Sequence, residues 1–180
     1  MIGESLLPWA VQAATIKGKS RMFWACFGFG QRTELAVMKG DPDSPHGGVT
    51  ARRYIEILEE YLPTILKRDS IFMQDGASIH TAHLVRDWFA DYDLEIMDWP
   101  PFSPDLNPIE NLWKRLKDEI IHLHPETLTM GDGDPAMEHL IKCAKEAWES
   151  LEEVMLNKLA ENMQKRVDAV LAAKGWYTKY

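Results

Sequence analysis

Residues 72–82, FMQDGASIHTA, and residues 99–113, WPPFSPDLNPIENLW, are the two stretches that determine the predicted fold. The first begins as a short apolar strand and carries Asp75 where that strand ends. The second passes through a proline-rich loop into an apolar-periodic helix that carries Glu110 in its first turn. Thirty-four residues separate these two carboxylates. The sequence therefore predicts a strand-end aspartate and a helix-start glutamate in positions suited to a shared site.

The segments around these stretches predict one continuous α/β domain without internal repeats. Their order is a hairpin, a helix, a strand, a helix, a strand and further helices, which is expected after the first strand of a ribonuclease-H-like fold, a mixed sheet flanked by helices. The predicted strands are 21–27, 33–38, 71–74 and 94–99. The predicted helices are 50–66, one N-capped by Thr81, one that follows Asn107 and Pro108, one after a loop at 124–135, and 152–173.

Composition places limits on the partners of this chain. Its 180 residues are 46% hydrophobic, which favours a folded domain over disorder. No apolar run approaches the roughly 20 residues needed to span a bilayer, so no membrane partner is expected. The net charge of −8 and pI of about 5.2 predict weak DNA binding, because Lys and Arg supply most affinity for phosphates. Cys26 and Cys143 have no neighbours at zinc-ligand spacing and are predicted to be ordinary thiols.

The two stretches resemble the catalytic core of Tc1/mariner-type DDE transposases, a family that keeps 34 residues between its second and third catalytic carboxylates. The resemblance extends from about Lys17 to the ending KGWYTKY at 174–180, which is similar to fungal members. It implies that residues 17–180 are a DDE transposase catalytic domain with the ribonuclease-H-like fold. It also implies metal-dependent DNA strand cleavage and strand transfer, Mg²⁺ or Mn²⁺ as cofactor, transposon-end and target DNA as partners, a homodimer and a nuclear location.

Under this resemblance Asp75 and Glu110 are both the catalytic residues and the metal ligands. Two divalent ions activate the attacking oxygen and stabilise the leaving one, and hard ions of this kind prefer carboxylate oxygens. A structural alternative exists for Glu110, because Asn107-x-x-Glu110 imitates a capping box and Lys114 lies four residues on. His80 matches a histidine of the family motif, but we interpret it as a hydrogen-bonded structural residue. Asp105 is interpreted as a turn acid that holds the loop before Glu110.

The first aspartate of the family is missing from the residues where it would be expected. Among residues 1–16 the only acid is Glu4, and in similar sequences the first aspartate lies some tens of residues before the counterpart of Lys17. Residues 1–16 are therefore interpreted as an atypical N-terminal remnant, and the sheet is expected to lack its first, central strand. Residues 7–15 are expected either to pair into that gap as a substitute strand or to stay disordered.

Three functions are consistent with these observations. The leading hypothesis is the catalytic domain of a Tc1/mariner-like DNA transposase, in a truncated and inactive copy. The alternative is a non-enzymatic, transposase-derived module for interaction or DNA tethering. A stand-alone nuclease of the same superfamily would need a third metal carboxylate and a basic groove, neither of which is visible in the sequence.

Overall fold

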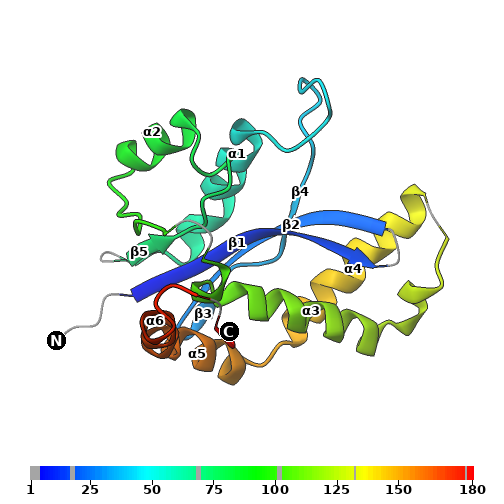
Figure 1. Cartoon of the computed structure of the whole chain (residues 1–180). Coiled ribbons are helices and arrows are strands. Elements are labelled where there is room, and N and C mark those ends of the chain that lie inside the picture. The colour runs from blue at the N-terminus through cyan, green and yellow to red at the C-terminus, as the bar shows by residue number, and fades with distance from the viewer. Residues whose placement is uncertain (1–4, 17–18, 68–69, 101–102, 132, 177) are drawn as a thin grey trace.

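A mixed five-stranded sheet forms the centre of the molecule (Figure 1). The computed structural model describes residues 5–16, 19–67, 70–100, 103–131, 133–176 and 178–180, and for 5–16 and 19–20 only the course of the backbone. The strands are β1 (Ser5–Ile16), β2 (Lys19–Gly28), β3 (Gln31–Arg32), β4 (Ala36–Met38) and β5 (Ser70–Met73). Their order is β3-β2-β1-β5, with β4 also paired to β2, and β1 runs antiparallel to β2 but parallel to β5.

The central position of the sheet is filled by β1, the segment interpreted above as a remnant. It pairs with β5 from Ser5 opposite Ser70 to Pro8 opposite Met73, and from Trp9 onward it pairs with β2. The sheet is therefore not short of a central strand, contrary to expectation, and the substitute-strand alternative is the one observed. The physical reason is that β2 and β5 would otherwise leave backbone N–H and C=O groups unpaired in the middle of the molecule.

The predicted hairpin is present, but its returning strand is divided into β3 and β4. Gly30 forms the turn with a φ of +69°, a left-handed conformation that glycine adopts without strain. Thr33 lies at the division. Its N–H donates to the Cys26 carbonyl (2.9 Å) and its hydroxyl accepts from the Cys26 N–H (3.0 Å). The threonine side chain thus takes the place of a backbone partner where the ladder is interrupted.

The strand predicted at 71–74 is β5, whereas the one predicted at 94–99 is reduced to a single parallel bridge between Phe72 and Ile96. The Phe72 N–H donates to the Glu95 carbonyl and the Met97 N–H donates to the Phe72 carbonyl, both at 2.8 Å. On its other side β5 pairs with β1 along all four of its residues. β5 brings Asp75 to the end of the sheet, two residues after Met73.

Helices cover both sides of the sheet. In the view of Figure 1, α1 (Ala51–Tyr61) and α2 (His83–Asp91) lie above it, and the remaining helices lie below. The predicted run 152–173 forms two helices that are separated at Asn162. The lower helices are α3 (Ile109–Leu123), α4 (Asp134–Ser150), α5 (Glu153–Glu161) and α6 (Met163–Ala172), and the 3-10 turns are η1 (Leu62–Thr64), η2 (Pro104–Leu106) and η3 (Pro125–Leu128).

The N-cap residues of α2 and α3 differ from the predicted ones. Thr81 does not cap α2, because its hydroxyl donates to the Ala77 carbonyl (3.2 Å) and Ala82 occupies the N-cap position. α3 begins one residue later than predicted. The Asn107 side chain still accepts a hydrogen bond from the Ile109 N–H (3.3 Å), so Asn107 does satisfy a donor at the helix start.

A single hydrophobic core joins the sheet to both helical layers. Trp148 of α4 crosses it and donates its indole N–H to the Thr33 carbonyl (2.9 Å), which ties α4 to the hairpin. Cys26 and Cys143 are both buried free thiols, as predicted. Within the described ranges, no helix has the length and apolar character that crossing a membrane requires. Other fully buried core residues are Phe23, Trp24, Phe27, Tyr54, Leu58, Phe72, Leu112 and Ile120.

Candidate active site

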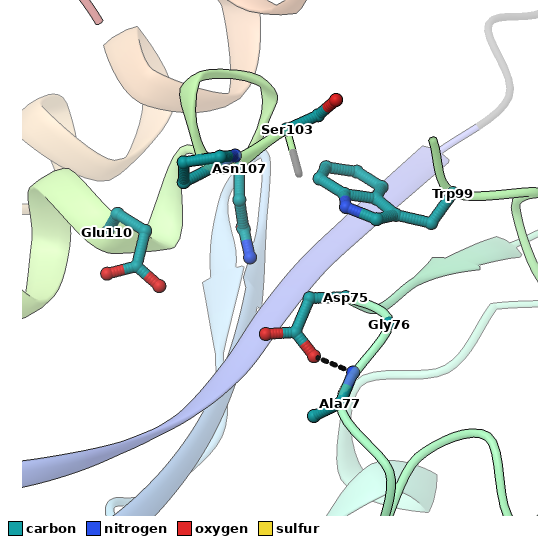
Figure 2. A pocket seen from close by; sticks show the side chains of 8 residues that line it. Asp75, Gly76, Ala77, Trp99, Ser103, Asn107 and Glu110 are labelled. Carbon is teal, nitrogen blue, oxygen red and sulfur yellow. Dashed lines mark hydrogen bonds between the residues drawn. The ribbon is translucent and has the colours of Figure 1, made fainter. Parts of the chain in front are cut away.

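Asp75 and Glu110 line the same pocket, which has a volume of about 350 Å³ (Figure 2). Asp75 enters from the end of β5, and Glu110 faces it from the first turn of α3. The predicted convergence of the two carboxylates is thus observed. The rest of the lining comes from the two sequence stretches that determine the fold: Gly76, Ala77, Trp99, Ser103, Pro104 and Asn107.

Asp75 is held in place through one of its carboxylate oxygens. Oδ1 accepts a hydrogen bond from the Ala77 N–H (3.0 Å) and lies 2.6 Å from Nδ1 of His80. The hydrogen bond with His80, aided by the one from Ala77, holds the pKa of Asp75 below its ordinary value of 3.8 despite partial burial. In Figure 2 the other oxygen points toward the side of the pocket where Glu110 lies. Asp75 is therefore an oriented carboxylate with a lowered pKa and one oxygen directed into the pocket.

His80 has the hydrogen-bonded role that the sequence favoured. Its side chain is buried, and its ring stacks at a tilt on Tyr54 with 4.9 Å between centroids. The Tyr54 ring thus limits rotation of the imidazole that contacts Asp75. His80 is a positioning residue for Asp75.

Glu110 differs from Asp75 in its electrostatic surroundings. Burial, followed by the negative charge of Asp75, raises the pKa of Glu110 above its ordinary value of 4.5, and Lys117 acts in the opposite direction. The capping-box alternative does not hold, because the Asn107 N–H donates to the Pro104 carbonyl (2.9 Å). That donor is therefore already used by the backbone of the loop. Glu110 thus lines the pocket, and the charge of Asp75 is one of the causes that raise its pKa.

The donor groups of the pocket suit a hard divalent cation. Two carboxylates from different elements approach one space, and the charge of Asp75 destabilises the ionised form of Glu110, a repulsion that a cation between them would reverse. No sulfur or imidazole ligand is among the lining residues given above. The start of α3 adds the partial positive charge of a helix N-terminus, which favours a phosphate nearby.

A third carboxylate is not supplied by the central strand. β1 contains neither aspartate nor glutamate, and Glu4 lies outside the described residues. The parallel register places Pro8 opposite Met73. Continuing it by two residues brings the backbone of Ala10 level with Asp75. The central strand β1 is therefore present, but it does not carry the first aspartate that the resemblance to the family implies.

The loop before Glu110 is braced by the end of the chain, which sequence reasoning missed. Asp105 Oδ2 accepts hydrogen bonds from both the N–H and the hydroxyl of Thr178, each at 2.7 Å. Arg166 of α6 donates to the Asp105 carbonyl (2.7 Å) and to the Asn111 side chain, and stacks on the Tyr180 ring at 4.8 Å. The interpretation of Asp105 as a loop-holding turn acid is confirmed. The sequence offered one signal for this contact, the presence of Arg166 within the predicted helix 152–173.

Comparison with known proteins agrees with this geometry. Residues 18–129 match the family described as DDE superfamily endonuclease. The Tc1 transposase of Caenorhabditis elegans is 31% identical over 175 residues, which cover 94% of this chain and 58% of that protein. The chain thus spans less than two thirds of the length of this relative.

Solved structures show the same fold. The Mos1 transposase catalytic domain, determined with Raltegravir and Mn, has a TM-score of 0.67 at 20% identity and covers 97% of this chain and 84% of its own. The Mos1 paired-end complex with the left transposon end has a TM-score of 0.67 at 21% identity and covers 91% of this chain and 46% of its own. At these identities the match establishes the ribonuclease-H-like architecture.

Proposed function

Because the chain belongs to the DDE superfamily endonucleases and is related to Tc1/mariner transposases, we propose that it is the divalent-metal-dependent catalytic domain of a DNA transposase. The observation that carries this proposal is the convergence of Asp75 and Glu110 on one pocket from a strand end and a helix start. We assign the roles of metal ligand and catalytic residue to these two side chains. The substrates are transposon-end and target DNA, and the related Mos1 protein has been determined in complex with a transposon end.

The chain's own residues contribute orientation and charge to this chemistry. His80 and the Ala77 N–H fix Asp75 as an ionised group with one oxygen free for a ligand. Positive charge in the pocket would act against the burial and the Asp75 charge that raise the pKa of Glu110, and so would favour its ionised form. Mg²⁺ or Mn²⁺, when bound, would supply activation of the attacking oxygen and stabilisation of the leaving oxygen. The N-terminus of α3 adds its partial positive charge at the same edge, which favours a nearby phosphate.

A second function, a non-enzymatic interaction or DNA-tethering module, is favoured by one observation. β1 fills the central strand without a carboxylate, so two of the three acids of the family site are identified here. Homodimerisation and a nuclear location accompany the transposase proposal and rest on the family alone.

Metal binding at the pocket tests the proposal. Mn²⁺ binding to the purified chain is measured by calorimetry and by the paramagnetic relaxation of water protons. Asp75→Asn and Glu110→Gln are each expected to weaken binding by about tenfold or more, since each removes a charged ligand. Asp118→Asn, at an exposed acid on the same helix as Glu110, is the matched control and is expected to bind as the unmodified chain does. Equal affinity in all four proteins would overturn the assignment.

A further inference from the structure

A second cluster of ligand-type side chains lies at the opposite end of α3 from Glu110. One nitrogen of His124, one oxygen of Glu126 and the sulfur of Cys143 all lie within 4.8 Å of one another. The three residues come from the end of α3, from η3 and from the middle of α4, which meet at the right of Figure 1. His124 lies fourteen positions after Glu110, so by helix rise the two residues are about 21 Å apart.

Two further side chains surround these three. His139, one turn before Cys143 on α4, places Nε2 3.2 Å from Glu126 Oε1. His124 has Nδ1 3.5 Å from Glu126 Oε1 and Nε2 3.1 Å from Glu146 Oε2. The Nε2 atom is buried, and its approach to Glu146 is too poorly aligned to count as a hydrogen bond among the described residues. Glu146 thus lies beside Nε2, and Nδ1 is the nitrogen that faces Glu126.

The backbone of this corner is rigid. Thr127 is fully buried, and both its N–H (3.0 Å) and its hydroxyl (2.7 Å) donate to the His124 carbonyl. The His124 N–H in turn donates to the Ile120 carbonyl (2.8 Å), which fixes it to the last turn of α3. Cys143 is buried where α3 and α4 pack together. The candidate ligands are therefore held by well-ordered elements on three sides.

We propose that His124, Glu126, Cys143 and His139 form a structural binding site for a Zn²⁺-class transition metal ion. Zn²⁺ is bound in proteins by cysteine sulfur, histidine nitrogen and carboxylate oxygen in tetrahedral sets of four. His124, Glu126 and Cys143 supply three such atoms within 4.8 Å of one another, and His139 Nε2 lies 3.2 Å from Glu126 Oε1 as the fourth candidate. Histidine and cysteine one helical turn apart, as at 139 and 143, lie on the same helix face. Glu146 has the place of the outer carboxylate that orients a metal-bound histidine.

This site differs in kind from the acidic pocket. The pocket offers oxygen donors, which suit Mg²⁺ and Mn²⁺, whereas sulfur and imidazole donors favour Zn²⁺. Burial, with the negative charges of Glu126 and Glu146, raises the pKa of the Cys143 thiol. The thiol is therefore protonated at neutral pH without a metal, and binding must release its proton. The sequence prediction of two ordinary thiols would then stand for Cys26 alone.

Cobalt spectroscopy of the purified full chain tests the site without any activity assay. Co²⁺ is expected to produce a thiolate-to-cobalt charge-transfer band that saturates at one equivalent bound at this site, and added Zn²⁺ is expected to remove the band by displacing Co²⁺. Cys143→Ser is expected to abolish the band, while Cys26→Ser, at the other buried cysteine, retains it. Proton release measured in buffers of different ionisation enthalpy should accompany binding by the unmodified chain.

A surface variant keeps the test decisive if Cys143→Ser does not fold. His139→Asn alters an exposed residue and is expected to weaken Zn²⁺ binding by about tenfold or more. His122→Asn, at an exposed histidine next to the cluster, is the control and is expected to leave affinity unchanged. Co²⁺ binding without a thiolate band, or equal Zn²⁺ affinity in the His139 and His122 variants, would overturn the proposal in favour of an ion-pair network only.

Discussion

The pKa values of the two pocket carboxylates are shifted in opposite directions, that of Asp75 downward and that of Glu110 upward, and each shift has a local cause. Asp75 is stabilised as an anion by His80 and the Ala77 N–H, whereas Glu110 is destabilised as an anion by burial and by Asp75. The pair thus carries a full negative charge on one member and a reduced tendency to ionise on the other. A divalent cation would remove this difference, because it favours the charged form of both.

Replacing His80 should release Asp75 from its depressed pKa. In His80→Asn the pKa of Asp75 is expected to rise toward its ordinary value of 3.8, because the largest stabilising contact is lost. Carbon-detected NMR titration of the Asp75 carboxyl group measures this directly. The control is His83→Asn, at an exposed histidine of α2. An unchanged Asp75 titration in His80→Asn would show that the contact does not set the pKa.

Asp41 provides a pH-dependent contribution to stability away from the pocket. It accepts from the Thr50 hydroxyl (2.6 Å) and from Arg52 (2.8 Å), contacts that lower its pKa from 3.8 to about 2. A carboxylate with a lowered folded pKa stabilises the fold above pH 3.8, and this contribution is lost as the pH falls from 3.8 toward 2. The unfolding free energy of Asp41→Asn is expected to be lower at neutral pH and to vary less across that window.

Urea unfolding from pH 5 to pH 2 measures the Asp41 effect. Asp43→Asn is the control, since Asp43 is exposed and the substitution keeps its backbone N–H, which donates to Asp41. Parallel curves for Asp41→Asn and the unmodified chain would contradict the linkage argument.

At the level of elements, the sequence predicted the hairpin, α1, β5 and the convergence of Asp75 with Glu110, because each rests on local periodicity or on a motif. For residues 7–15 it left two alternatives, a substitute strand and disorder, and did not decide between them, because the pairing with β5 joins Ser5 to Ser70, which is far away in sequence. The strand expected at 94–99 is reduced to one bridge with Phe72, although β5 pairs along all four of its residues with β1. The brace on Asp105 was missed because its contacts join residues 61 and 73 positions apart.

The register of β1 predicts the position at which a third carboxylate could be introduced beside the pocket. If Ala10 lies level with Asp75, then Ala10→Asp adds a charged ligand beside the pocket, and Mn²⁺ affinity is expected to rise roughly tenfold or more. Calorimetry on the folded variant measures this. Ala13→Asp, further along the same strand, is the control and should not raise affinity. A gain in both variants would point to a general effect of charge rather than to the register.

The C-terminal brace should stabilise the loop that carries Glu110. Thr178→Val removes the hydroxyl that donates to Asp105, with an expected loss of about 1 kcal/mol in unfolding free energy. Arg166→Met leaves the Asp105 carbonyl without its donor, with an expected loss of about 1–3 kcal/mol. Urea unfolding measures both losses, and hydrogen exchange should report faster opening of residues 105–110. Thr178→Ser keeps the hydroxyl and is expected to match the unmodified chain.

For the whole molecule, fold and charge have different implications for DNA. The architecture is that of a transposase catalytic domain, but a net charge of −8 repels phosphate at long range. An acidic catalytic domain is compatible with DNA chemistry when other basic surfaces supply the binding energy. This chain spans 58% of the length of its Tc1 relative, so the activity of a complete transposase is part of the proposal.

The purified chain is expected not to nick supercoiled plasmid DNA in Mg²⁺ or Mn²⁺. Two identified carboxylates hold two ions less favourably than three, at the point where transition-state charge must be neutralised. Gel separation of nicked and supercoiled plasmid measures this, with Asp75→Ala and Glu110→Ala as controls for contaminating nuclease. Metal-dependent nicking that disappears in both variants would contradict the expectation and direct attention to Glu4.

The brace between Asp105 and Thr178 also has a consequence for the order of events during translation. The ribosome delivers the loop 73 residues before the segment that holds it. The loop that positions Glu110 therefore gains this support only after α4, α5 and α6 have been synthesised and have packed onto the domain. A nascent chain released before Arg166 would already contain every strand and most of the core, yet its pocket would lack the support of α6. The strands of the sheet are thus synthesised early, and the contacts that position the loop before Glu110 form late.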